Sequence, residues 1–128
     1  MNLETNFLFL DVLLHVLSRP RIVASSLEVA VEGDRVEIKC QINLSNGVVW
    51  KYYNATSAYT LSEDTALLHN FGMDYNVTNI NNGFYKISCL TITQVKKSNA
   101  GTYICLNYEN LQQIVTSVDL VLLSKHQL

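Results

Sequence analysis

The stretch Gly101-Thr102-Tyr103-Ile104-Cys105 is the most informative part of this sequence, because of how its cysteine is spaced from a cysteine and a tryptophan far upstream. Cys40 ends the run Val31-Glu32-Gly33-Asp34-Arg35-Val36-Glu37-Ile38-Lys39-Cys40, and Trp50 follows shortly after it. Between these positions the chain has short β-branched and aromatic runs separated by Gly, Asn, Asp and Ser. No helix-period segment occurs between residues 26 and 123. The sequence therefore predicts one all-β domain over 26–123.

The set of Cys40, Trp50, Tyr103 and Cys105, with its flanking runs, resembles the immunoglobulin superfamily. The resemblance implies a Greek-key β-sandwich with one inter-sheet disulfide between Cys40 and Cys105. The residues it places in the core are Trp50, Tyr103 and Leu90. The same framework serves many unrelated recognition tasks, so it indicates a fold and not a function.

Hydrophobic alternation and turn residues predict the strands, which are expected at 27–31, 35–42, 48–53, 85–93, 101–108 and 114–123. The long interval between Trp50 and Leu90 leaves room for two more strands, near 59–61 and 66–68. The length of this interval favours the variable type (V-set) of the immunoglobulin fold over its shorter types.

Several residues differ from the pattern of variable-type relatives. Asn99 stands where many of them carry an Asp, and 74–82 has no Arg or Lys to pair with it. We therefore expect neutral hydrogen bonds at this end of the sandwich. The Gly-x-Gly bulge of antigen-receptor joining segments is absent, which argues against an antibody or T-cell receptor chain. Residues 102–108 contain no Arg that could bind the carboxylate of a sialic acid, which argues against a sialic-acid lectin.

Alternation also predicts which side chains point away from the core. If Trp50 and Cys105 point inward, their sequence neighbours point outward. The outward set is apolar and aromatic apart from one lysine: Val49, Lys51, Tyr53, Ile104, Leu106 and Tyr108. An apolar patch on a soluble domain marks an interaction site more often than not. The alternative is that the extra strands, or a retained N-terminal leader, cover this patch.

The first 25 residues differ from the rest of the chain. Phe7 to Leu17 is an apolar run of signal-peptide length, and small residues follow at Ala24-Ser25-Ser26. We predict a cleaved signal peptide over 1–25, with the cut near 24–26. Asp11 and His15 interrupt the run, so a retained amphipathic segment is the alternative. The run is too short to span a bilayer, and 124–128 reads as a C-terminal tail.

Three sequons, at Asn43, Asn54 and Asn76, are candidate glycosylation sites. With the disulfide that the resemblance implies, they predict a secreted or extracellular location. Cys89 is out of phase with Leu90, so it is expected to face outward, where it could bridge to a second chain and form a homodimer. The alternative is a shielded free thiol.

Composition and motifs argue against several functions. Charged residues make up 16% of the chain and the net charge is −2, so no nucleic-acid partner is expected. His15, His69 and His126 are scattered, and the chain has no CxxC, HExxH or glycine-rich phosphate loop. We therefore expect no enzyme activity, no metal and no cofactor.

The sequence thus predicts an extracellular module that binds a protein through the face formed by 48–53 and 101–108. The partner is either a like domain or a different receptor or ligand, and the 107–113 loop would add specificity through Tyr108, Glu109 and Gln112. The sequence is equally compatible with a role in cell adhesion, in immune recognition or in decoy binding of an immune ligand. The alternative function is a structural spacer in a longer adhesion or muscle-type protein.

Overall fold

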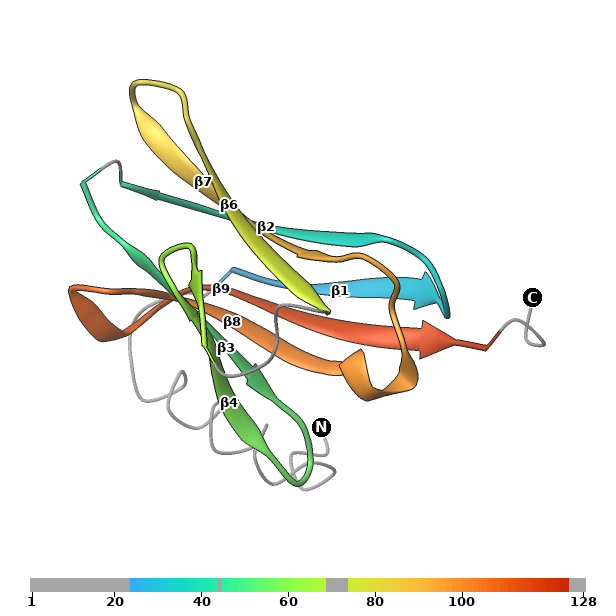
Figure 1. Cartoon of the computed structure of the whole chain (residues 1–128). Coiled ribbons are helices and arrows are strands. Elements are labelled where there is room, and N and C mark those ends of the chain that lie inside the picture. Colours follow the sequence, from blue (N-terminus) through green and yellow to red (C-terminus); the bar gives the residue numbers. More distant parts are fainter. Residues whose placement is uncertain (1–23, 44, 69–73, 125–128) are drawn as a thin grey trace.

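The computed structural model describes residues 24–43, 45–68 and 74–124, and the structural statements below concern these residues. They form nine strands in two layers (Figure 1). The strands are β1 (Ala24–Val31), β2 (Val36–Asn43), β3 (Val48–Tyr53), β4 (Ala58–Glu63), β5 (Ala66–Leu67), β6 (Tyr75–Asn81), β7 (Tyr85–Ile92), β8 (Gly101–Asn107) and β9 (Asn110–Leu123). A short 3-10 turn, η3 (Lys97–Asn99), precedes β8.

One layer is a six-stranded sheet in the order β1-β9-β8-β3-β4-β5, and the other is a three-stranded sheet in the order β2-β7-β6. Neighbouring strands are antiparallel except β1 and β9, which run parallel. This is an all-β, immunoglobulin-like sandwich, in which β4 and β5 extend the larger sheet. The two additional strands predicted near 59–61 and 66–68 are confirmed.

The bounds of the predicted strands match within a few residues, and β6 is a further strand whose range was not predicted. The first and last strands begin earlier than expected, at Ala24 and Asn110. β1 begins at Ala24, where its pairing with Thr116 on β9 starts. The predicted cleavage region therefore overlaps the first residues of a paired strand. The rest of the predicted signal peptide, and 125–128 of the predicted tail, lie outside the described residues.

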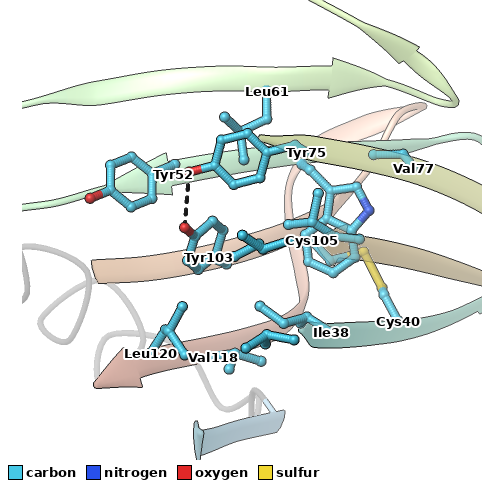
Figure 2. Close-up of a cluster of buried hydrophobic side chains, with 14 of the residues drawn as sticks. Ile38, Cys40, Tyr52, Leu61, Tyr75, Val77, Tyr103, Cys105, Val118 and Leu120 are labelled. Atoms are coloured by element: carbon cyan, nitrogen blue, oxygen red, sulfur yellow. Dashed lines mark hydrogen bonds between the residues drawn. A yellow bond between two sulfur atoms is a disulfide. The ribbon is translucent and has the colours of Figure 1, made fainter. Parts of the chain in front are cut away.

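The Cys40–Cys105 disulfide joins β2 to β8 and so connects the two sheets across 65 residues of sequence, as the resemblance implied (Figure 2). Trp50 is fully buried, and its Nε1 donates to Ser88 Oγ at 2.9 Å. The indole N–H is therefore satisfied by β7, across the interior of the sandwich. Tyr103 and Leu90, the other two predicted core residues, are also fully buried.

The expected neutral hydrogen bonds form a closed ring at the end of the sandwich near η3, and an ion pair between Lys96 and Asp74, at 3.1 Å, joins the same end. Tyr103 OH donates to the backbone oxygen of Asn99 at 2.5 Å, so its oxygen is the acceptor for Tyr75 OH at 3.0 Å. Asn99 Nδ2 in turn donates to Tyr75 OH at 3.0 Å. Figure 2 shows the tyrosine pair. Because Asn99 is only 2% exposed, each of these groups depends on the others for its hydrogen bonds.

Gly101 explains why the stretch before Cys105 begins with a glycine. Its φ is +149°, and a Cβ there would lie 2.6 Å from the backbone oxygen of Tyr53 and 2.7 Å from the ring of Tyr52. A side chain would separate β8 from β3. It would also displace Tyr52 OH, which donates to the backbone oxygen of Ala100.

We predict that Asn99→Ala lowers the free energy of unfolding by about 1–3 kcal/mol, because it leaves buried polar groups without partners. Lys96 N, which donates to Asn99 Oδ1 at 2.8 Å, loses its acceptor as well. Urea denaturation followed by tryptophan fluorescence measures the change. Asn76→Ala, at an exposed position on β6, is the matched control and should change stability by less than about 0.5 kcal/mol. Equal effects of the two variants would contradict the structural role of the ring.

We also predict a loss of stability at alkaline pH. Burial raises the pKa of both Tyr103 and Tyr75 above the usual tyrosine value. Because the folded-state pKa is the higher one, their contribution is complete below about pH 10 and is lost as the pH rises further. The urea midpoint should therefore fall as the pH rises from about 10 to about 12, less steeply in Tyr103→Phe. An unchanged midpoint over this range would contradict the assignment.

Candidate interaction surface

The six-stranded sheet carries a second apolar cluster that is separate from the main core. Val49, Ile104 and Leu106 form it, and Tyr53 and Ile114 pack against it. Trp50 and Cys105, their sequence neighbours, belong to the main core. The five residues therefore lie on the face turned away from the three-stranded sheet. We call them the outer cluster, and this face the outer face.

The outward direction of Val49, Ile104 and Leu106 is thus confirmed, but their predicted exposure is wrong. They are only 3%, 2% and 5% exposed. Lys51 and Tyr53 are half-buried, and burial raises the pKa of Tyr53. Alternation along a strand determines the side of a sheet on which a residue lies, but not whether something covers that side.

Tyr108 is the member of the predicted surface that is well exposed, at 53%. It does not lie in a 107–113 loop as expected, because β9 already begins at Asn110. Asn107 pairs directly with Asn110, so Tyr108 and Glu109 form a tight hairpin turn. Asn107 Oδ1 accepts from Glu109 N at 2.9 Å and its Nδ2 donates to Gln113 Oε1 at 3.1 Å, which stabilises the turn.

Contacts with Gly47 hold Tyr108 in place. Tyr108 N donates to the backbone oxygen of Gly47 at 2.9 Å. A Cβ on Gly47 would lie 3.3 Å from Tyr108 Cβ, so the absent side chain leaves room for the ring. An exposed tyrosine on a supported hairpin loses little entropy when a partner covers it. An Asn-Gly pair such as Asn46-Gly47 is typical of a turn, but nothing in the sequence indicates this contact.

The outer side of the three-stranded sheet differs sharply in chemistry. Its exposed positions on β2 and β6 include Glu37, Lys39, Gln41, Asn43, Asn76 and Thr78. Two of the three predicted glycosylation sites, Asn43 and Asn76, are exposed on this side, away from the outer cluster. The apolar residues on this side include Ile80, which is 52% exposed, and its cross-strand neighbour Ile87. The outer side of the three-stranded sheet is therefore mainly polar on β2 and β6, whereas the outer face carries a contiguous apolar cluster.

Asn54, the third predicted glycosylation site, is part of the turn after β3. Its Oδ1 accepts from Thr56 N at 2.9 Å and Ser57 N at 2.8 Å, and its Nδ2 donates to Tyr52 OH at 3.1 Å. A glycan on this nitrogen would compete with the bond to Tyr52. Glycosylation at all three positions remains a prediction.

Cys89 lies on β7 between Lys39 on β2 and Thr78 on β6. It is outside the main core, as its phase predicted, but it is only 5% exposed and is a free thiol. Loss of hydration raises the pKa of Cys89, and the nearby Glu37 adds to this effect. A covered thiol with little thiolate argues against a bridge to a second chain and favours the alternative of a shielded thiol.

Within residues 24–43, 45–68 and 74–124, no three His, Cys, Asp or Glu side chains gather in a way that could hold a metal ion. The three histidines lie outside these residues. No helix in the same ranges is long and apolar enough to cross a membrane.

We predict that Cys89 reacts slowly with an aromatic disulfide reagent at pH 8 in the native protein and rapidly in urea. The reason is that burial both covers the sulfur and raises the pKa of the thiol. Absorbance of the released thiolate gives the two rates, and Cys89→Ser is the blank. Native reactivity equal to that in urea, or a dimer that reductant separates, would contradict this assignment.

Comparison with known proteins does not place the chain in a family. No family model matches it, and no curated protein matches it.

Proposed function

We propose that this chain is a non-catalytic, extracellular recognition domain of the immunoglobulin superfamily, V-set. It binds a protein partner, either a like domain or a different receptor or ligand, through the outer face. The observation that carries this proposal is the contrast between the two sheets. One outward side is mainly polar along β2 and β6 and carries two sequons, whereas the other carries the outer cluster.

The apolar character of the outer face continues beyond the outer cluster toward β1. Val121 pairs with Val29, and both lie on the same side of the sheet as Ile104. The large apolar side chains exposed along β1 and β9 are Leu27, Val29, Leu111 and Val121, at 66%, 50%, 51% and 43%. Burying this area would contribute about 25 cal/mol for each Å², before the cost of association.

Lys51 would give the surface its specificity. It is the charged residue among the predicted contact residues, and it sits across from Ile104. A partner that buries the ammonium group without offering an acceptor loses hydration energy, so the surface favours partners with a carboxylate or carbonyl at this point. Tyr108 at the hairpin supplies an aromatic anchor of the kind that dominates binding energy in protein interfaces.

An extracellular location is supported by the Cys40–Cys105 disulfide, a bond that persists in oxidising compartments. A second candidate function, a structural spacer in a longer adhesion or muscle-type protein, is favoured by one observation. Val49, Ile104 and Leu106 are already buried, and a covered face needs no partner.

We predict that Lys51→Glu and Tyr108→Ala each weaken binding of the secreted domain about tenfold or more. The measurement is surface binding to a panel of extracellular domains that includes the chain itself. Lys39→Glu, the same charge change on the other sheet, is the matched control and should leave affinity unchanged. If Lys39→Glu weakens binding and the other two variants do not, the interaction uses the other sheet. A spacer would show no binding to any member of the panel.

A further inference from the structure

Two Asn-Gly pairs lie in turns at the same end of the sandwich. Asn46-Gly47 precedes β3, and Asn82-Gly83 connects β6 to β7. The two turns are at one end because Asn43, the last residue of β2, pairs with Tyr85, the first residue of β7. In such a pair the glycine nitrogen can attack the side-chain carbonyl carbon of the asparagine, since glycine has no Cβ to hinder the approach. The chain therefore offers two sites for one reaction in different surroundings.

Hydrogen bonds occupy the groups that would react at Asn82-Gly83. Gly83 N donates to Asn81 Oδ1 at 2.8 Å, so the nitrogen that would attack is held in its protonated form. Asn82 Oδ1 accepts from Phe84 N at 3.0 Å and from Tyr85 N at 2.9 Å, which fixes the side-chain amide. Ring closure would have to release the first bond and turn the side chain away from the other two. The native turn therefore opposes the reaction.

The surroundings of Asn46 favour the reaction instead. Lys86 Nζ donates to the backbone oxygen of Asn46 at 2.6 Å. That oxygen belongs to the same peptide group as the Gly47 nitrogen, and resonance distributes charge between the two atoms. When Gly47 N loses its proton, much of the negative charge lies on this oxygen, where the ammonium group of Lys86 stabilises it. The lysine therefore makes the attacking nitrogen easier to form.

The ammonium group is held in place, whereas the side chain that it would activate is held loosely. The Lys86 side chain is only 15% exposed, and Asp64 Oδ1 lies 3.8 Å from Nζ. The Asp64 side chain is 52% exposed and more distant than the Asn46 oxygen, so it takes only part of the ammonium charge. Asn46 Oδ1 is 3.5 Å from Ser45 Oγ, which is long for a hydrogen bond. The amide of Asn46 can thus turn toward Gly47 N.

We propose that Asn46-Gly47 is a site of spontaneous deamidation and that Lys86 promotes the reaction. Gly47 N forms a bond to the side-chain carbonyl carbon of Asn46. The bond from that carbon to the amide nitrogen breaks, and the nitrogen leaves as ammonia with the proton that Gly47 N has lost. Water then opens the cyclic succinimide. The product is aspartate when the bond from Gly47 N to the side-chain carbon breaks, and isoaspartate when the bond to the backbone carbon breaks.

The isoaspartate product would disturb the neighbouring hairpin. Its main chain runs through the former side chain, so the peptide group between residues 46 and 47 is displaced. Gly47 O, which accepts from Tyr108 N at 2.9 Å, is displaced with it, and Tyr108 loses its support. The domain would then bind its partner more weakly as it ages. This effect on binding rests on the proposed function, whereas the modification itself does not.

Isotope labelling of the full chain measures the reaction at both sites in one sample. The protein is kept in warm, neutral buffer made with ¹⁸O-labelled water and is then digested in ordinary water. Residues that reacted before digestion carry ¹⁸O, and fragment ions in tandem mass spectrometry separate Asn46 from the nearby Asn43. We expect the labelled fraction at Asn46 to exceed that at Asn82 several-fold, with part of the product as isoaspartate.

Three lysine variants make the test specific. Lys86→Met removes the ammonium group and keeps an apolar stem, so the ratio of labelling at Asn46 to labelling at Asn82 should fall several-fold. Lys86→Arg retains the positive charge and should preserve most of this ratio. Lys39→Met, on the exposed side of β2, is the matched control and should leave the ratio unchanged. Using the ratio corrects for any loss of stability, because opening of the fold frees both turns.

A native chain in which Asn82 is labelled as much as Asn46 would overturn the inference. A ratio that Lys86→Met leaves unchanged would overturn the role of the lysine. Modified protein that retains its full affinity for a partner would overturn the effect on binding and count against Tyr108 as a contact residue. The modification would still stand in that case, because the isotope measurement does not depend on a partner.

Discussion

The Cys40–Cys105 disulfide, packed with Trp50, is the constraint on which the rest of the molecule depends. It closes a loop of 65 residues and contributes about 4 kcal/mol on the chain-entropy account. Its structural consequence is more important than this energy, because it fixes the direction of Cys105 on β8 and, through pairing, that of Trp50 on β3. Strand alternation then places Ile104, Leu106 and Val49 on the opposite side. The apolar outer face is therefore a consequence of how the core is joined.

The five residues from Gly101 to Cys105 combine several of these requirements in one strand. Gly101 lets β8 approach β3, Tyr103 closes the hydrogen-bonded ring with Asn99 and Tyr75, and Cys105 joins the sheets. Ile104 lies between these core residues and points the other way. Because the core needs both neighbours of Ile104 in fixed positions, Ile104 cannot turn inward, and it packs with Val49 and Leu106 on the outer face.

The sequence was most informative where the signal is local. Period-two alternation and turn residues predicted β3 with its observed bounds and the direction of the outer cluster, and the length of the interval between Trp50 and Leu90 predicted both additional strands. The exposure of Val49, Ile104 and Leu106 was not predictable in this way, because it depends on what lies over the sheet. The burial of Cys89 depends on its register with Lys39 and Thr78, and the tight turn at Tyr108 depends on the pairing of Asn107 with Asn110. These pairings arise from tertiary structure and leave little trace in a single sequence.

The central claim is that the outer face is the surface through which this domain binds its partner. Methyl NMR of the monomeric domain, with and without a partner identified in the binding panel, tests it most directly. The account predicts that binding shifts the methyl resonances of Ile104 and leaves those of Ile80, on the other sheet, unchanged. Shifts of the Ile80 methyl groups without any shift at Ile104 would contradict it.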